Sequence, residues 1–145
     1  MIEIIIPVGL PASGKTNWAI EYINKNPDTV RVCRDDFRKM LFGKYHNFPF
    51  GDKRYEDFVT ELEHDAIDTA ITRGYNVIVD ATNLRDPHKF NYFTNNPSNI
   101  EVKTRIEDSF LSVPVEECIK RDKNRENGVG ENVIRGMYNK YINEG

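Results

Sequence analysis

The sequence lacks several features that mark specialised classes of protein. No apolar run approaches the ~20 residues that a membrane-spanning helix needs, and the N-terminus lacks the basic and apolar regions of a secretion signal. Only two of the 145 residues are cysteines, and Cys33 and Cys118 form neither a metal-binding spacing nor a disulfide framework. We therefore expect a cytoplasmic protein that acts in a reducing compartment without a membrane.

An excess of positive charge is also missing. The chain has 20 lysines and arginines against 23 aspartates and glutamates, a net charge of -3. Proteins that coat long nucleic acids are usually basic, so this class is disfavoured. An enzyme that touches a few phosphates at one nucleic-acid end is still compatible with this charge. The length and the 39% hydrophobic content predict one globular domain over residues 1–145.

Apolar, β-branched runs alternate with segments of helical periodicity along the whole chain. The runs predict strands at residues 2–8, 29–33 and 75–79 and a fourth within 101–111. The helical segments are 14–24, 35–42, 54–73, 86–94, 114–125 and 131–143, with a loop at 43–53. Such alternation predicts an α/β fold, with a four- or five-stranded parallel sheet covered by helices on both faces. Ligands of such sheets bind at the carboxyl ends of the strands.

The first predicted strand ends in the stretch GLPASGKT, which is the full P-loop pattern in its strand–loop–helix setting. Backbone N–H groups of such a loop and of the following helix N-terminus hold phosphate oxygens. Lys15 would supply charge to the β- and γ-phosphates, and Thr16 would offer its hydroxyl to Mg²⁺. The pattern predicts ATP and Mg²⁺ as cofactors. The expected phosphate-binding residues are Gly9, Pro11, Ala12, Ser13, Gly14, Lys15 and Thr16.

The second predicted strand ends in the stretch RDDFR, Arg34 to Arg38. One interpretation is that Asp35 or Asp36 caps the next helix. Beside a P-loop, however, an aspartate can accept the proton of an attacking hydroxyl. An arginine one turn later, Arg38, can hold an anionic part of the acceptor. The two interpretations are compatible, because two aspartates are present.

Two further features belong at the same edge of the sheet. Asp80 closes the third predicted strand, where a carboxylate is the expected second partner of Mg²⁺, although a turn or cap is the alternative. Arg121 and Arg125 are four residues apart on one helical face. They could neutralise the transferring phosphoryl group, or they could belong to an ordinary solvated face.

Taken together, these motifs resemble those of P-loop 5′-hydroxyl polynucleotide kinases, above all the kinase domains of phage members that also carry a phosphatase. The resemblance covers nearly the whole chain. It rests on residues 9–16, Trp18-Ala19, Lys25-Asn26-Pro27, residues 34–38, Thr82-Asn83-Leu84 and residues 133–138. It implies a P-loop kinase fold with a helical lid, and ATP-dependent phosphorylation of the 5′-hydroxyl end of DNA or RNA, as in nucleic-acid repair.

The resemblance also implies catalytic roles for four residues. Lys15 would hold the ATP phosphates, Asp35 would be the general base for the 5′-hydroxyl, and Arg38 would contact the acceptor's phosphate. Arg125, together with Arg121, would cover the ATP phosphates. The expected partners are ATP and a 5′-hydroxyl nucleic-acid end, and no protein partner is evident.

The resemblance implies a metal pair of Thr16 and Asp80, with one departure from the phage pattern. In the phage members the acid directly precedes the Thr-Asn pair, whereas here Ala81 takes that place and Asp80 lies one residue earlier. Other family members carry Asp-x-Thr-Asn. The sequence contains no Asp-x-Asp-x-Thr phosphatase motif, so we expect no phosphatase domain in this chain.

Two other functions fit the P-loop. A small-molecule kinase acting on a sugar, nucleoside or antibiotic hydroxyl would have nearly the same site, but an uncharged acceptor has no use for Arg38. A nucleotide-binding switch without an acceptor would have no use for Asp35. These two residues therefore distinguish the three hypotheses.

Overall fold

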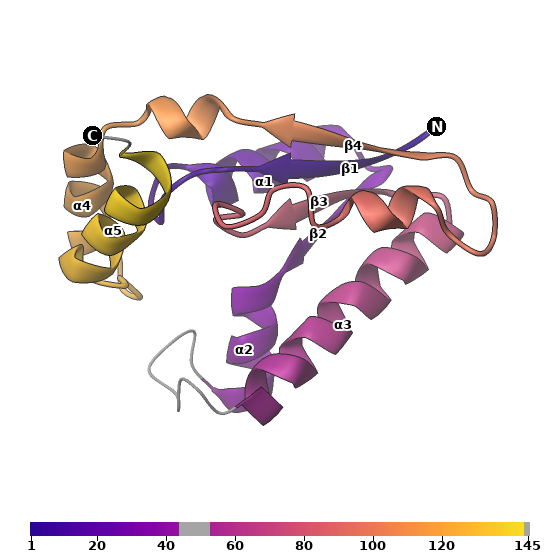
Figure 1. Cartoon of the computed structure of the whole chain (residues 1–145), viewed down its shortest axis with the longest axis horizontal. Coiled ribbons are helices and arrows are strands. Elements are labelled where there is room, and N and C mark those ends of the chain that lie inside the picture. The colour runs from indigo at the N-terminus through magenta and orange to yellow at the C-terminus, as the bar shows by residue number, and fades with distance from the viewer. Residues whose placement is uncertain (44–52, 144–145) are drawn as a thin grey trace.

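The computed structural model describes residues 1–43 and 53–143, and its elements follow the predicted alternation (Figure 1). The strands are β1 (Ile2–Pro7), β2 (Thr29–Cys33), β3 (Asn76–Asp80) and β4 (Val102–Glu107). The helices are α1 (Lys15–Lys25), α2 (Arg34–Phe42), α3 (Lys53–Thr72), α4 (Val115–Lys123) and α5 (Glu131–Met137). The predicted loop at 43–53 falls almost entirely outside the described residues.

The four strands of the described residues form one parallel sheet in the order β2-β3-β1-β4. Register is continuous across the sheet: Val77 of β3 lies opposite Val30 of β2 and Ile4 of β1, and Ile4 lies opposite Thr104 of β4. Because all strands point the same way, their carboxyl ends meet at one edge. The predicted α/β fold with a parallel sheet is confirmed.

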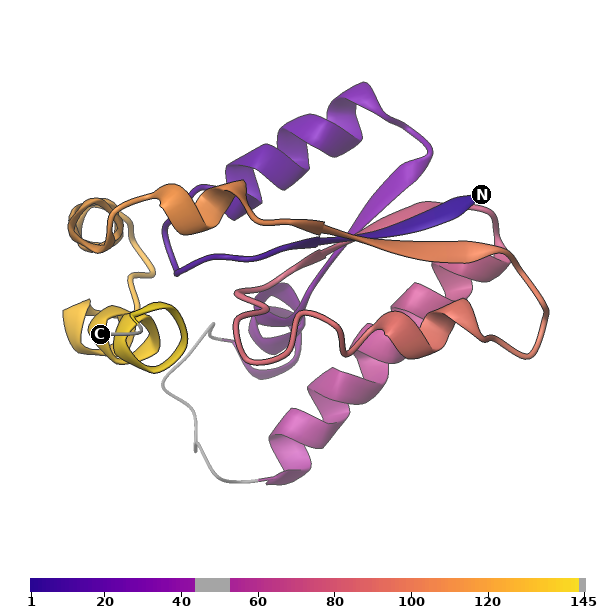
Figure 2. The same ribbon diagram turned by 45° about the horizontal axis from the view of Figure 1, so that its top comes forward.

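Helices bury both faces of this sheet, as Figure 2 shows for α1 on one side and α3 on the other. Ile5 and Ile78 pack against Ala19 of α1, and all three are fully buried. The other face of the sheet includes Ile4, Ile6, Val77 and Val79. It packs against Ile67 of α3 and against two phenylalanines, Phe90 and Phe93. Burial on both faces explains why β1 and β3 are continuous apolar runs.

The helix predicted at 86–94 is wrong. The structure has a turn, in which the His88 N–H donates to Asp86 Oδ1 at 3.1 Å, followed by a short 3₁₀ helix at Asn91–Thr94. Phe90 and Phe93 are both buried and lie three residues apart, and the Phe93 N–H donates to the Phe90 carbonyl. A 3₁₀ turn brings residues i and i+3 onto one face, so both rings reach the sheet.

The C-terminal helices lie beside the carboxyl edge of the sheet (Figure 1). Leu10 of the P-loop packs in a buried cluster with Cys118 and Ile119 of α4 and Ile134 of α5. The last predicted helix, 131–143, consists of α5 followed by a wider π-helical segment over Tyr138–Ile142. The expected lid segment is therefore anchored directly to the phosphate-binding loop.

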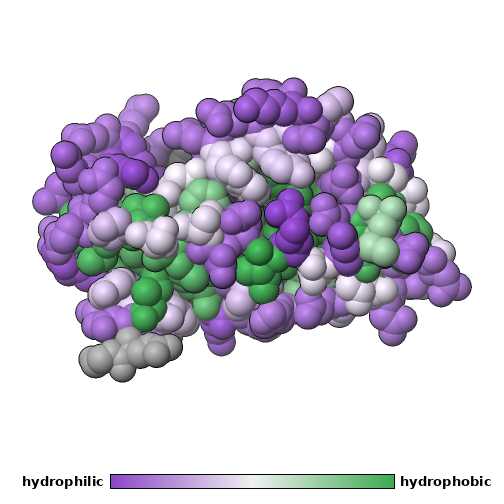
Figure 3. All heavy atoms as spheres, turned by 90° about the horizontal axis from the view of Figure 1, so that it is seen from above, coloured by the Kyte–Doolittle hydropathy of each residue, from purple (hydrophilic) through white to green (hydrophobic). Residues whose placement is uncertain are grey.

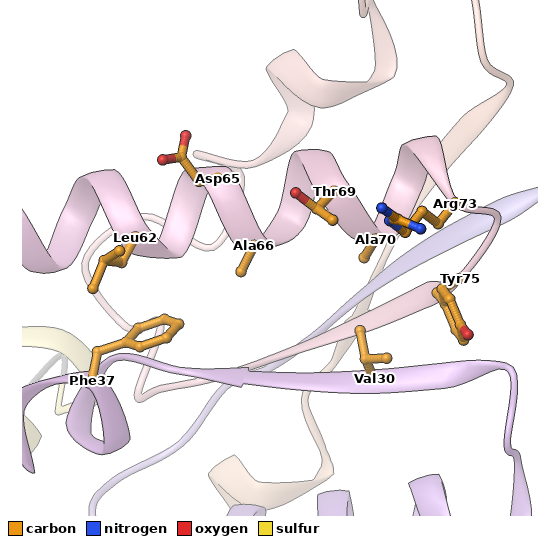
Figure 4. Close-up of a pocket in the computed structure, with 9 residues that line it drawn as sticks. All are labelled: Val30, Phe37, Leu62, Asp65, Ala66, Thr69, Ala70, Arg73 and Tyr75. Atoms are coloured by element: carbon orange, nitrogen blue, oxygen red, sulfur yellow. The ribbon is translucent and has the colours of Figure 1, made fainter. Parts of the chain in front are cut away.

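The surface of the described residues is mostly hydrophilic. Figure 3, seen from above β4, shows hydrophilic side chains around the margin and hydrophobic groups gathered along the middle. An apolar groove of about 450 Å³ lies between α3 and the edge strand β2, where Val30 and Phe37 face Leu62, Ala66 and Ala70 (Figure 4). No helix in residues 1–43 and 53–143 is long and apolar enough to cross a membrane.

Candidate active site

The P-loop owes its shape to glycines at two positions. A Cβ atom on Gly9 would lie 2.7 Å from both the Phe110 Cβ and the Ser13 Oγ, so only glycine allows this approach. Gly14 precedes α1 with a φ of +105°, a left-handed conformation that side chains disfavour. Ala12 also has a positive φ of 65°. The glycine spacing of the motif thus follows from backbone geometry.

Lys15 is the first residue of α1, and its side chain is only 6% exposed. Its Nζ donates hydrogen bonds to the Gly9 carbonyl at 2.9 Å, the Leu10 carbonyl at 2.6 Å and the Ser13 Oγ at 3.2 Å. The ammonium group therefore lies within the curve of the phosphate-binding loop, where the motif requires a cation.

Burial lowers the pKa of Lys15 from its usual 10.5 to about 8. The Asp80 and Asp35 carboxylates oppose this shift, and the Arg125 guanidinium adds to it. Each of these three side chains is close enough to act on the charge of Lys15. These three side chains come from the end of β3, the start of α2 and the segment after α4, so residues distant in the sequence influence the charge of Lys15.

Thr16 and Asp80 form a direct pair. Thr16 Oγ1 donates to Asp80 Oδ2 at 2.9 Å, and Asp80, the last residue of β3, is 4% exposed. These oxygen groups fit Mg²⁺, which prefers hard oxygen ligands and usually takes only one or two from the protein. Among the described residues, no group of three or more acidic, histidine or cysteine side chains could hold a metal. The pair therefore suits a metal that takes its other ligands from phosphates and water.

The pair has a third member that the sequence analysis missed. Arg31 of β2 donates from Nε to Asp80 Oδ2 at 2.7 Å and from Nη1 to Asp36 Oδ2 at 2.7 Å. The signal for it was a charged residue in the middle of the apolar strand run TVRVC. A strand residue alternates faces with its neighbours, so an arginine there must face a carboxylate or solvent.

Asp35 and Arg38 also lie together, at the start of α2. Arg38 Nη1 donates to Asp35 Oδ1 at 2.6 Å, while its Nε and Nη2 donate to the two carboxylate oxygens of Glu56 on α3. The Asp35 side chain is 62% exposed, whereas that of Arg38 is 18% exposed. The N-cap of α2 is Cys33, so the interpretation of either aspartate as the N-cap is wrong. The Asp35 carboxylate thus faces solvent with a guanidinium beside it.

A second arginine extends this charged cluster along α3. Arg34 donates to Thr60 Oγ1, to Glu63 Oε1 at 3.2 Å and to Glu56 Oε2 at 2.9 Å. Glu63 is only 1% exposed, although it lies on a helix that is otherwise rich in solvated charge. Glu56 and Glu63 are positioning groups that the sequence analysis did not identify. The available signal was the position of Glu63 on the apolar stripe of α3, four residues after Val59 and four before Ile67.

The two predicted lid arginines lie on the P-loop side of α4 and differ in their partners. Arg121 Nη1 points to the Ala12 carbonyl at 3.5 Å, while its Nε donates to Glu117. Arg125, just beyond the end of α4, pairs with Asp122 at 2.8 Å. Asp122 is buried and also accepts the N–H groups of the loop residues 129 and 130. The loop that follows Arg125 is therefore tied to the same carboxylate that holds Arg125.

A P-loop at the carboxyl edge of a parallel sheet, with a lysine and a threonine–aspartate pair, defines a kinase-type P-loop domain. A family model described as an AAA domain matches residues 4–141, and the chain belongs to this family. A curated relative, the L-seryl-tRNA(Sec) kinase of Methanococcus maripaludis, is 28% identical over 148 residues. That match covers 98% of this chain and 53% of the relative, so the chain spans about half the length of this protein.

Two solved structures match as well. One is the Pnkp1/Rnl/Hen1 RNA repair complex, with a TM-score of 0.71 and 30% identity over 97% of this chain and 44% of that one. The other, a Pnkp1/Rnl/Hen1 complex, has a TM-score of 0.61 and 32% identity over 83% of this chain and 39% of that one. The predicted resemblance to polynucleotide kinases is confirmed at the level of the family. Both neighbours belong to multi-protein complexes, so the expectation of no protein partner is not supported.

Proposed function

We propose that this domain transfers the γ-phosphoryl group of ATP to the 5′-hydroxyl end of a nucleic acid, DNA or RNA. One observation carries the proposal: the Asp35 carboxylate and the Arg38 guanidinium lie 2.6 Å apart at the strand end beside the P-loop. The carboxylate is a base for a hydroxyl, and the guanidinium is a receptor for a phosphate. A nucleotide with a free 5′-hydroxyl and a 3′-phosphate carries both groups on one sugar.

The transfer step balances within this set of residues. Asp35 accepts the proton of the 5′-hydroxyl while that oxygen forms a bond to the γ-phosphorus. The bond from the γ-phosphorus to its bridging oxygen breaks, and ADP leaves. Lys15 holds the β- and γ-phosphates, and Arg121 and Arg125 offset the charge of the phosphoryl group in transfer.

Thr16 and Asp80 would hold Mg²⁺ in this scheme, and the bound ion would neutralise charge on the ATP phosphates. Positioning and charge neutralisation are the main catalytic contributions in phosphoryl transfer, so the protein needs no covalent step. Thr16 directly follows Lys15 in α1 and donates to the buried Asp80, which supports a common role in holding the donor.

A second acceptor is favoured by one comparison. The seryl-tRNA kinase relative matches 98% of this chain, which supports a serine hydroxyl carried on tRNA as the alternative substrate. In both cases the acceptor is a hydroxyl joined to a nucleic acid. A free sugar or antibiotic is less favoured, because it carries no phosphate that could contact Arg38 in place of the Asp35 or Glu56 carboxylate.

The test compares acceptors with γ-labelled ATP. We expect kcat/KM for a nucleoside 3′-phosphate or a 5′-hydroxyl oligonucleotide to exceed that for the bare nucleoside about 30-fold or more, the effect of ~2 kcal/mol from a guanidinium–phosphate contact. Arg38→Ala should erase most of this difference and leave ATP binding intact. Arg73→Ala, at an exposed arginine just beyond the C-terminal end of α3, is the matched control.

Three outcomes contradict the proposal in different ways. Equal use of a nucleoside and its 3′-phosphate would replace it with a small-molecule kinase. Label on seryl-tRNA but not on 5′-hydroxyl ends would favour the second acceptor. Hydrolysis of ATP without label on any acceptor would indicate a nucleotide-binding switch.

A further inference from the structure

Arg31 occupies an unusual place for a cation. It lies in the middle of β2 opposite Ile78 of β3, while Asp80 lies two residues further along β3. In-register neighbours and residues two apart point to the same side of a sheet, so Arg31, Ile78 and Asp80 share one face. That face is the one covered by α1, which carries Thr16. The arginine is therefore directed into the phosphate side of the site, with its side chain only 16% exposed.

The contacts of Asp80 are concentrated on one oxygen. Asp80 Oδ2 accepts from Thr16 Oγ1 at 2.9 Å and from Arg31 Nε at 2.7 Å. Two donors on one oxygen fix the plane of the carboxylate. They also set the direction of the threonine hydroxyl: its hydrogen points at Asp80, so the lone pairs of its oxygen are directed elsewhere and can face a cation.

The same guanidinium reaches the acceptor side of the site. Arg31 Nη1 forms an ion pair with Asp36 Oδ2 at 2.7 Å, and Asp36 follows the proposed base Asp35 in the first turn of α2. One planar, permanently charged group therefore connects the end of β3 to the start of α2. Lysine could supply the charge but not both contacts in this geometry.

We propose that Arg31 is a positioning residue of the metal site, which orients Asp80 and moderates its charge toward Mg²⁺ through the 2.7 Å contact; this proposal rests on the donor half of the proposed function. A full positive charge near a carboxylate weakens the attraction of that carboxylate for a second cation. The arrangement therefore exchanges metal affinity for a fixed ligand geometry. Mg²⁺ binds less tightly than it would to Asp80 alone, but its carboxylate partner is held in place.

The experiment measures metal-dependent nucleotide binding rather than transfer. The affinity for ATP is determined by isothermal titration calorimetry over a range of free Mg²⁺, for the wild type and for Arg31→Met, Arg31→Lys and Asp36→Asn. We expect the half-saturating Mg²⁺ concentration to fall at least about threefold in Arg31→Met, because a unit charge within several ångströms is removed. It should stay within about twofold of wild type in Arg31→Lys, which keeps the charge, and in Asp36→Asn, which removes a carboxylate that contacts the far end of Arg31 rather than Asp80.

A fall of less than threefold in Arg31→Met, no change, or a rise overturns the proposal. So does an equal fall in Arg31→Lys or Asp36→Asn. A purely structural role would lower the melting temperature without moving the Mg²⁺ dependence. If circular dichroism shows that Arg31→Met does not fold, Arg31→Gln replaces it with the same expectation. No acceptor is present in this measurement, so its result is independent of whether a nucleic acid, a seryl-tRNA or a small molecule accepts the phosphoryl group.

Discussion

The two halves of the proposed site, the donor side and the acceptor side, are built by different means. On the donor side, Ser13, Lys15 and Asp80 are all buried, and their places are set by strand register and by backbone that only certain residues allow. On the acceptor side, Asp35 and Arg38 are held by ion pairs between long side chains on α2 and α3. A pocket made of backbone tolerates little change, whereas paired side chains can be exchanged singly. This difference fits relatives that share the fold at 28–32% identity but carry different names for what they act on or assemble with.

The largest effect should come from the buried donor side. Lys15→Ala removes the ammonium group from the curve of the P-loop, so both ATP binding and transfer should fall, the latter by a factor of about 10³ or more. Calorimetry with ATP and transfer of label measure the two losses. Lys25→Ala at the exposed end of the same helix is the control and should behave as wild type. If Lys15→Ala still transferred label, the donor side would tolerate substitution as well as the acceptor side does.

A substitution on the acceptor side should affect transfer but not ATP binding. Asp35→Asn keeps the shape of the side chain but removes the base, so transfer should be lost while ATP affinity stays near the wild-type value. The same two measurements apply. An equal loss of ATP binding in Asp35→Asn and Lys15→Ala would assign Asp35 to the metal or to the fold instead.

Arg125 follows α4 and pairs with Asp122, and its removal should have an intermediate effect. Its removal in Arg125→Ala should slow transfer by a factor of 10² or more, roughly 3 kcal/mol of transition-state stabilisation. Single-turnover rates at saturating ATP measure this loss. Lys123→Ala, which removes a more exposed cation from the end of the same helix, should change the rate little. A loss of less than twofold in the transfer rate of Arg125→Ala would indicate that Arg125 belongs to an ordinary solvated face.

The smallest effect should come from pH. Lys15, whose pKa burial lowers to about 8, is protonated below that pH and loses its charge above it. ATP affinity should therefore be constant below pH 8 and fall by up to tenfold for each pH unit above it. Calorimetry with ATP between about pH 6.5 and about pH 10 tests whether the affinity falls as the pH rises. Lys15→Arg keeps its charge throughout, so any binding that it retains should not show this decline.

Patterns local in the sequence predicted the donor side well. The P-loop, its strand and its helix occupy consecutive residues, and the buried runs predicted that Asp80 would reach the same sheet edge. The acceptor side was predicted only in part, because its partners are distant in the chain. Nothing local distinguishes Glu56 from the solvated charges of α3, and the contacts of Glu56 and Glu63 with Arg34 depend on how α2 packs against α3.

The same limit explains the other differences. Arg31 meets Asp80 only through the pairing of β2 with β3, which periodicity does not specify. The segment at 86–94 has a helical start signal and two apolar residues at helical spacing, but contact with the sheet selected the tighter turn. Local propensity was overruled where tertiary packing set the geometry.

The contact between Gly9 and Phe110 has a consequence for how the protein is made. The residue that encloses the phosphate-binding loop from outside comes from the turn after β4, the last strand of the sheet to be synthesised. When only β1, β2 and β3 have left the ribosome, the whole P-loop motif is present, but Phe110, which lies against Gly9, is not. Contacts this distant form only after the cost of ordering the intervening chain has been met. The P-loop therefore gains this neighbour only after β4 has been made, although the loop itself precedes β2 in the chain.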